Sequence, residues 1–411
     1  MGEYTKSLDL KAKTVVLDEA DDEERGIYAK ILYDNARAFR GFDQAMIVFL
    51  SDHGYAGDPS DIKAMAKFVR TRFAEADVPP LHNFRDLFNP GKGSSLETAF
   101  KICFAFQLTV QETNDFFKRV MFERGIDCHL LHEAACYFGL KHRLPYRETV
   151  AMIQQIPKGR TGTMVPTRDV LYTVKIVEDI EGISEKENLI RYLTENLESF
   201  AYNNAGAIKF IQFFWSKIIG PEGLAVKEGE LISEMLNSLH PEKEDDFVIS
   251  SEKASTWTIY CQIMGLDKRQ EMLYSSNRSL SPVFTDNVLL PLKASDCFPS
   301  QQIIDGILRG EFDGKYEKFR KMLIFLAFYT YWAKILTDKK DIFYCSGYEE
   351  GDRCKERINK YLADAGYPEL YPGNPYDWIF LWSMNDDQPL NTFRAYMREV
   401  YIAKTSDIAE V

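Results

Sequence analysis

The chain has 411 residues, of which 45% are hydrophobic and 13% aromatic, and it carries a formal net charge of −12. This composition supplies enough apolar side chains for two or three packed cores and excludes a mainly disordered chain. The acidic balance repels a phosphate backbone, so it excludes a protein whose whole surface follows nucleic acid and restricts such binding to a local patch.

Seven cysteines are scattered along the chain without the spacing of a disulfide framework. Their odd number and apolar surroundings are typical of reduced thiols in the cytosol. The N-terminal segment lacks the apolar core of a signal peptide, and the most apolar stretch, from Met322 to Ala333, is too short to span a bilayer. We therefore expect a cytoplasmic protein without a membrane partner.

Residues 1–24 end in the acidic run DEADDEE and show no sustained periodicity. We interpret them as a solvated lead-in, and an acidic arm that shields a basic site is the alternative. From Ile27 onward most segments repeat apolar residues at helical spacing, and strand alternation with hairpin turns is nearly absent. These patterns predict an all-α, multi-module helical protein.

Helix starts are predicted where a hydroxyl and a carboxylate stand three residues apart, because the two side chains can cap the exposed amides of a first turn. Three such capping boxes occur in the first half of the chain: Ser94 with Glu97, Thr109 with Glu112, and Ser184 with Glu187. They predict helix starts near 95, 110 and 185. Further along, Asn374 before Pro375 predicts another start.

The helix that follows Thr109 is predicted to bury one side. Its buried stripe is expected to consist of Thr113, Phe116, Phe117, Val120 and Met121. Gly125 comes next and can adopt the left-handed conformation that ends many helices. We therefore expect this helix to run toward Gly125.

Two stretches rich in turn formers separate the helical segments, PKGRTGTMVPTRD at 157–169 and NRSLSPVFTDN at 277–287. They predict three helical domains, over 25–156, 168–276 and 288–404.

An internal repeat is possible between FRKMLIFLAFY (319–329) and AFKICFAFQL (99–108). In each segment a lysine precedes a dense apolar run, and a second amphipathic helix follows. The C-terminal domain is therefore a candidate relative of the N-terminal domain.

The segment GKGSSLETAFKICFAFQLTVQETNDFF, residues 91–117, combines a Gly-Lys turn, a Ser-x-Glu-Thr helix start and an apolar helix that ends in Leu-Thr. This order resembles the second half of lambda-repressor-like helix-turn-helix domains. In that family the helix before the Gly-Lys turn is the recognition helix, which here corresponds to LHNFRDLF at 81–88. The resemblance implies that His82, Asn83 and Arg85 face base edges and that Lys92 contacts a phosphate.

The first half of the motif departs from that family. Residues 61–80 form a long stretch without the tight glycine turn that sets the usual angle between the two helices, although Pro79 and Pro80 can break a helix there. From Lys63 to Lys92 six basic residues stand against three acidic ones, so the patch is mildly basic. DNA binding and a helix-turn-helix scaffold used for protein contacts are both left open.

A wider resemblance covers residues 50–150, the phrase FPSQQIIDGILRGE at 298–311 and the ending AGYPELYPGNPYDWIFLW. These segments resemble a group of uncharacterised helical proteins common in anaerobic Gram-positive gut bacteria. The resemblance implies a helical fold and a cytosolic location, and it implies no activity.

The densest group of reactive side chains is DCHLLHEAAC, at 127–136. His132 and Cys136 stand four residues apart, as do His129 and Glu133, so imidazole, thiol and carboxylate can share a helix face. Zinc needs a closed set of four ligands, and no CxxC, HExxH or second cysteine-histidine pair completes one. A packed helix with a buried stripe is the simpler interpretation, and neither a metal nor another cofactor is expected.

Other motifs support weaker alternatives. GKGSS at 91–95 has the glycine, lysine and serine of a phosphate loop but lacks its upstream glycine and preceding strand. SDHG at 51–54 is interpreted as a helix end rather than a catalytic triad, and SGYEEGDRC at 346–354 as a solvated loop rather than a cation site. The apolar segment 319–336 predicts a central buried helix, with a helix covered by a partner as the alternative.

Together these patterns predict a non-enzymatic regulatory protein with a helix-turn-helix-like module that contacts duplex DNA through Asn83, Arg85 and Lys92. A homodimer is expected, because half-site readers gain affinity from symmetry. The alternative is a helical scaffold that holds a protein partner in a mobile-element or phage-defence context. An enzyme that uses the 127–136 cluster is a third hypothesis.

Overall fold

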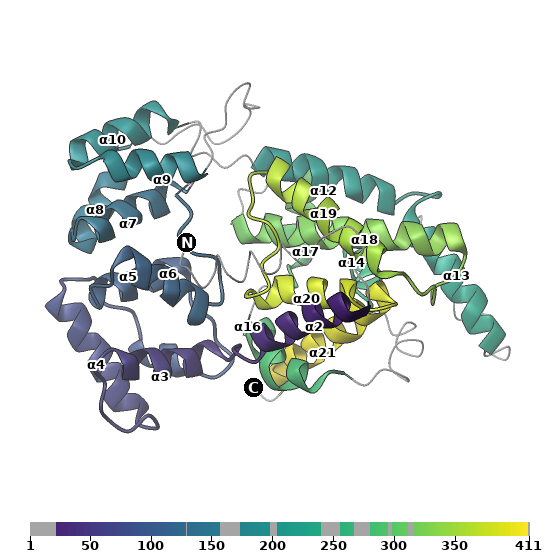
Figure 1. The fold of residues 1–411 in the computed structure, drawn as a ribbon, viewed down its shortest axis with the longest axis horizontal. Helices are drawn as coiled ribbons and strands as arrows, with labels where there is room; N and C mark the ends of the chain where they lie inside the picture. Colours follow the sequence, from purple (N-terminus) through teal and green to yellow (C-terminus); the bar gives the residue numbers. More distant parts are fainter. Residues whose placement is uncertain are drawn as a thin grey trace. The chain divides into compact units, whose positions relative to one another are not determined.

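The computed structural model describes residues 22–128, 130–156, 173–197, 204–239, 255–266, 280–294, 298–310 and 316–409. Every regular element in these ranges is a helix, which confirms the all-α prediction (Figure 1). The chain divides into two compact units: unit 1 comprises residues 1–11 and 38–203, and unit 2 comprises 12–37 and 204–411. Among the described helices none has the length and apolar character needed to cross a membrane.

Unit 1 is a succession of short helices. They are α3 (Phe42–Asp52), α4 (Ile62–Glu75), the 3-10 helix η1 (Phe84–Phe88), α5 (Leu96–Ala105), α6 (Val110–Arg119), α7 (Leu131–Lys141), α8 (Tyr146–Gln154), α9 (Thr173–Gly182) and α10 (Lys186–Glu195). Helix η1 packs against both α3 and α4, and α4 also packs against α5. Further along, α7 packs against α8 and α9.

Two hairpins of unit 1, α5–α6 and α7–α8, turn in the same way. The second residue after each first helix, Gln107 or Arg143, has a positive φ, of 51° and 56° respectively. The next amide then bonds back to a carbonyl five residues earlier, from Leu108 to Cys103 and from Leu144 to Gly139. The guanidinium of Arg143 donates to the carbonyl of Gln107, so the two turns are also bonded to each other. Unit 1 therefore contains a repeated helical hairpin.

The repeat proposed from sequence paired different segments, 99–108 and 319–329. The first begins in α5, which has ten residues and ends at Ala105, and the second lies in α18 (Tyr316–Lys339), which has 24. A shared apolar run was the basis for the pairing, and the two helices that carry this run differ in length.

The predicted helix starts lie within a residue or two of the observed ones, and the caps differ in detail. Thr109 and Glu112 form the predicted capping box, and Asn374 caps α20 with Pro375 in the first turn. Helix α5 is capped by Ser95 instead of Ser94, and α10 starts after Glu185 without a side-chain cap. The capping box was thus correct in one of the three predicted cases.

Helix α6 buries Thr113, Phe116 and Phe117 as predicted, but it ends earlier than expected. Its last residue is Arg119, and the residue that follows with a positive φ is Phe122 rather than Gly125. The amide of Glu123 bonds back to the carbonyl of Phe117, so a turn replaces the predicted last turn of helix.

Glu112 gives unit 1 a stabilising interaction that depends on pH. The backbone N–H of Thr109 donates to Oε2 of Glu112 at 2.7 Å, and this bond holds the pKa of Glu112 below its ordinary value. A carboxyl group with a lowered pKa in the folded state stabilises the fold above its unfolded pKa, and this stabilisation is lost as the pH falls through the folded pKa.

Glu112→Gln is therefore expected to lower the stability of unit 1 at pH 7 by about 0.3–1 kcal/mol, the range for a charge at a helix N-terminus. Thermal unfolding of wild type and variant, measured at pH 7 and near pH 3, checks this. The two unfolding curves should differ at pH 7 and approach each other near pH 3. A difference of the same size at both pH values contradicts the capping argument.

Unit 2 contains the remaining helices. They are α2 (Asp22–Ala36), α12 (Asn204–Ile218), α13 (Leu224–Leu239), α14 (Thr256–Ile263), the π-helix η4 (Phe284–Val288), α16 (Leu289–Ala294), α17 (Gln301–Arg309), α18, α19 (Tyr348–Asp364), α20 (Pro375–Met384) and α21 (Pro389–Ala409). Helix α18 contacts α12, α13, α19 and α21, and its residues from Phe319 to Tyr329 are buried. The apolar segment 319–336 is thus the central core helix that the sequence predicts.

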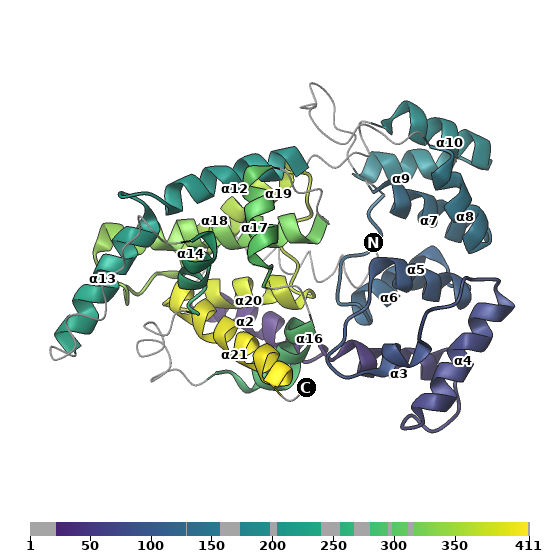
Figure 2. The same ribbon diagram turned by 180° about the vertical axis from the view of Figure 1, so that it is seen from behind.

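Helix α2 belongs to unit 2 although unit 1 follows it in the chain. It lies beside α20 in both views (Figures 1 and 2), and the indole N–H of Trp378 donates to the carbonyl of Leu32 at 2.8 Å. Because α2 begins at Asp22, the last residues of the expected acidic lead-in are helical. The chain thus forms α2 in unit 2, then folds into unit 1 from residue 38, and returns to unit 2 at residue 204.

The two units do not follow the three domains expected from the turn-rich stretches. The middle segment 168–276 is divided, because α9 and α10 pack on α7 and α8, whereas α12, α13 and α14 pack with the helices of unit 2. The whole of the first stretch, 157–169, lies outside the described residues. The second stretch contains most of η4, which packs on α16 and α2, so it is a structural element instead of a linker.

The acidic segment at 346–354 is also helical rather than a loop. Glu349 and Glu350 occupy the first turn of α19, where carboxylates interact favourably with the helix dipole, and both are paired with Arg353.

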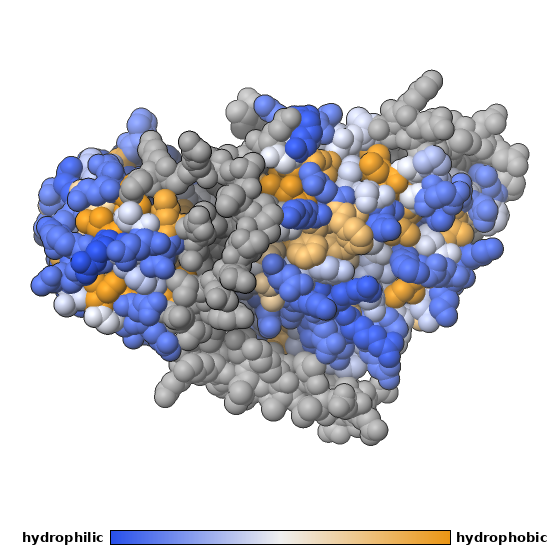
Figure 3. Space-filling model, turned by 90° about the horizontal axis from the view of Figure 1, so that it is seen from above, coloured by the Kyte–Doolittle hydropathy of each residue, from blue (hydrophilic) through white to orange (hydrophobic). Residues whose placement is uncertain are grey.

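Seen from above (Figure 3), the surface of this side of the molecule mixes hydrophilic and hydrophobic residues.

Candidate functional site

The segment predicted to be a recognition helix, residues 81–88, forms only the five-residue 3-10 helix η1. Its apolar residues Phe84, Leu87 and Phe88 are buried, and the ring of Phe84 packs edge-on against Phe73 of α4. These three side chains take up one side of η1. The polar residues of the segment are left on the exposed side, so η1 is an anchor for the loop between α4 and α5.

Asn83 and Lys92, two of the four predicted DNA contacts, make local interactions within this loop. The Asn83 side chain accepts from the N–H of Arg85 at 3.1 Å and donates to the Asp86 carboxylate at 3.0 Å. The ammonium of Lys92 lies 3.6 Å from the same Asp86 carboxylate. Asp86 therefore interacts with Asn83 and Lys92, two of the residues that were predicted to contact DNA. These interactions order the loop before α5.

His82 and Arg85, the other two predicted contacts, are exposed. No carboxylate partner for either is found in the part of the chain that the structure describes. The structure thus brings all four predicted residues onto one loop and leaves two of them available to a partner.

The outer face of α4 carries three more cations that were not among the predicted site residues. Lys63, Lys67 and Arg70 follow one another at intervals of four and three residues, which places them on a single exposed stripe, while Met65, Ala66, Val69 and Phe73 form the buried side. The guanidinium of Arg70 lies over the ring of Phe84, 5.4 Å from its centroid, so the stripe adjoins η1. We call Lys63, Lys67, Arg70 and Arg85 the cationic face.

The cationic face has no acidic partner within the described ranges, unlike the neighbouring cations Arg72 and Lys92. The nearby Arg72 pairs with Glu75 at 3.4 Å, and Arg147 pairs with Asp77 at 3.3 Å. An unpaired cluster of cations attracts anions more strongly than paired charges do, and it does so over a distance set by the ionic strength.

Charge is unevenly distributed along the sequence. Between Ala38 and Ile156 the sequence has 14 basic and 14 acidic residues, so this region is neutral within a chain of net charge −12. The acidic excess that argues against nucleic acid therefore lies elsewhere in the sequence. The signal that could have located the cationic face is the helical spacing of Lys63, Lys67 and Arg70, which a count of charges does not detect.

The reactive cluster at 127–136 is built into the core of unit 1. Both carboxylate oxygens of Glu133 accept from Arg124, at 3.0 and 2.8 Å, and one also accepts from the N–H of Asp127 at 2.7 Å. Glu133 is thereby fully engaged in holding the loop before α7. No group of three potential metal ligands occurs among the described residues, and His129 lies outside them.

His132 and Cys136 do meet, with 3.7 Å between Nε2 and Sγ. Burial lowers the pKa of His132, and burial raises the pKa of Cys136 well above its ordinary value. A neutral imidazole next to a protonated thiol is the opposite of the ion pair that activates a nucleophilic cysteine. The arrangement therefore fits a packed core better than nucleophilic catalysis.

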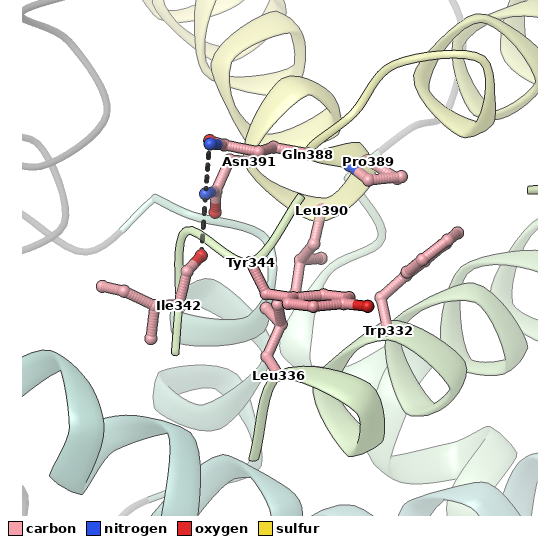
Figure 4. Close-up of a pocket in the computed structure, with 8 residues that line it drawn as sticks. All are labelled: Trp332, Leu336, Ile342, Tyr344, Gln388, Pro389, Leu390 and Asn391. Carbon is pink, nitrogen blue, oxygen red and sulfur yellow. Dashed lines mark hydrogen bonds between the residues drawn. The ribbon is translucent and has the colours of Figure 1, made fainter. Parts of the chain in front are cut away.

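A shallow pocket in unit 2 lies between the end of α18 and the start of α21 (Figure 4). It has about 230 Å³ of empty space, part of it open solvent, and is lined by Trp332, Leu336, Ile342, Tyr344, Gln388, Pro389, Leu390 and Asn391. The amide of Asn391 donates to the carbonyl of Ile342 at 2.9 Å, which ties the segment after α18 to α21. The side chain of Asn391 therefore has a structural role in the wall of the pocket.

Comparison with known proteins supplies no relative. No protein-family model matches the chain, and no curated protein and no solved structure matches it either.

Proposed function

We propose that this chain is a cytosolic, non-enzymatic regulatory protein that binds nucleic acid through unit 1. The observation that carries the proposal is the cationic face, four exposed basic side chains on α4 and η1 without acidic partners in the described ranges. Nucleic-acid affinity comes largely from such contacts with phosphates, because each contact releases condensed counterions. The resemblance of residues 91–117 to helix-turn-helix domains supports the same assignment.

Removal of the stripe on α4 should weaken binding without unfolding unit 1. The variant Lys63→Ala, Lys67→Ala, Arg70→Ala is expected to lose at least tenfold in affinity for a fluorescent 20-base-pair duplex at 100 mM salt, as measured by anisotropy. The side chains are exposed, so the unfolding temperature should stay close to that of the wild type.

A matched control removes the same net charge elsewhere. Lys227, Lys334 and Arg353 are exposed residues of unit 2, and each is paired with a carboxylate. Their joint replacement by alanine should leave the affinity within about twofold of the wild type, since paired exposed charges contribute little. Equal losses in the two triple variants would mean that net charge alone governs binding, and the cationic face would then have no special role.

A protein-interaction module in unit 2 is the second candidate function. Its support is Phe213 on α12, which is 50% exposed and lies 5.5 Å from the ammonium of Lys217. Aromatic side chains, phenylalanine included, are enriched at protein–protein interfaces relative to the rest of the surface. Phe213→Ser is expected to abolish recovery of a stoichiometric partner with the tagged protein, whereas the control Tyr33→Ser, on α2, should not. Recovery that both variants leave unchanged argues against this candidate.

A further inference from the structure

We infer that the cationic face binds the sugar-phosphate backbone of duplex nucleic acid without recognising its sequence. This inference rests on the proposed function and departs from the expectation that residues 81–88 recognise base edges. Three properties of the site carry it: the engaged amide of Asn83, the spacing of the cations on α4, and the burial of the nearby aromatic rings.

Base recognition by Asn83 is blocked by its own hydrogen bonds. An asparagine identifies adenine by using its amide oxygen and nitrogen together. In this loop the oxygen accepts from the N–H of Arg85 and the nitrogen donates to Asp86, at 3.1 and 3.0 Å. A base contact has to break both bonds and also bring the Asp86 carboxylate close to DNA. Arg85 and His82 are the only predicted contacts left exposed and unpaired in the described chain.

The spacing of the cations on α4 suits phosphates. Lys63 and Arg70 are seven residues apart, which corresponds to about 10 Å along a helix. One strand of a duplex carries a phosphate for about every 3.4 Å of axial rise, and the winding of the strand places successive phosphates farther apart than that rise. A stripe of about 10 Å can therefore reach up to three phosphates, one for each cation of α4. Arg85 adds a fourth contact where the stripe meets η1.

The aromatic rings beside the cationic face favour a duplex over a single strand. Single-stranded nucleic acid is held chiefly by bases that stack on exposed aromatic side chains. Phe73 and Phe84 are 1% and 2% exposed, so neither presents a ring to a base. Duplex bases are already stacked on one another, and the backbone is the part of the duplex that this face can reach.

The test measures anisotropy with two 20-base-pair duplexes, one rich in A·T and one rich in G·C, and with one labelled single strand. Affinities for the two duplexes should agree within about threefold and exceed that for the single strand. Between 50 and 200 mM salt the duplex affinity should fall about 100-fold, the value for four phosphate contacts. In the triple alanine variant of α4 the duplex affinity should fall only about fourfold over the same salt range, which is the value for one phosphate contact.

Arg85→Ala should weaken binding to both duplexes by the same factor. A preference of more than tenfold for one duplex, lost in Arg85→Ala, overturns the inference and assigns base recognition to η1, while the proposed function stands. Binding of the single strand as tight as that of the duplexes also overturns it. Absence of binding to all three probes overturns the proposed function together with this inference.

Discussion

Glu228→Ala is expected to lower the free energy of unfolding of unit 2 by about 3–5 kcal/mol, the usual cost of leaving a buried charge without its partner. Glu228 and Arg394 are completely buried, and their side chains form two bonds, of 2.6 and 3.0 Å. The hydroxyl of Tyr329 adds a third bond to the carboxylate at 2.8 Å. The substitution leaves the Arg394 guanidinium in an apolar core.

The surroundings of Arg394 explain why the core has little room to adapt. Gly265 has a φ of +76°, and a Cβ atom placed there would lie 2.7 Å from the Cβ of Arg394. The guanidinium also donates to the carbonyl of Ile263 at 3.2 Å. The arginine is thus fixed between α14, α13 and α18, and it cannot turn toward water when Glu228 is absent.

Denaturant unfolding of three variants checks this prediction. Tyr329→Phe should cost about 1.5–3 kcal/mol, because it removes one hydrogen bond to a charged group. Glu228→Leu combined with Arg394→Met should be more stable than Glu228→Ala, since no buried charge is left over. If Glu228→Ala lies within about 1 kcal/mol of the wild type, the ion pair does not hold these helices together.

Asp377→Ala is the second substitution with a large expected effect, again about 3–5 kcal/mol. The Asp377 carboxylate accepts two bonds from Arg320, at 2.8 and 2.7 Å, and one from the N–H of Tyr371 at 2.9 Å. Arg320 also donates to the carbonyls of Pro368 and Glu369. One carboxylate therefore fixes α18, the start of α20 and the loop between α19 and α20.

Hydrogen exchange and denaturant unfolding test this role separately. The amide of Tyr371 should exchange faster in Asp377→Ala than in wild type, while amides of unit 1 should be unaffected. The control Arg353→Ala removes the surface ion pairs with Glu349 and Glu350 and should cost at most about 1 kcal/mol. Slow exchange at Tyr371 in the variant, together with unchanged stability, would show that the loop is held by other contacts.

The sequence is a good guide to local structure in this protein. The all-α class, the central helix at 319–336, the start of α20 at Pro375 and the capping box of Thr109 with Glu112 are observed as expected. Each depends on residues within one or two turns of each other, and the physical causes are apolar periodicity and capping of exposed amides.

Features that depend on more distant residues were missed or misplaced. The helix predicted at 81–88 is shortened to η1 because Phe84, Leu87 and Phe88 turn inward against α3 and α4. The expected middle domain is divided between two units because α9 and α10 pack with earlier helices. Periodicity does not identify which helices pack together, so these outcomes could not be predicted from it.

By itself, then, the sequence determined the helical class and the positions of several helices, since short-range interactions decide both. Only the tertiary structure decided the placement of charge. It paired Glu228 with Arg394 across 166 residues and bonded Asn83 to Asp86, while Lys63, Lys67 and Arg70 stayed on an open surface. A charge buried in an apolar core must find a partner, whereas an exposed one is solvated by water and is free for a ligand.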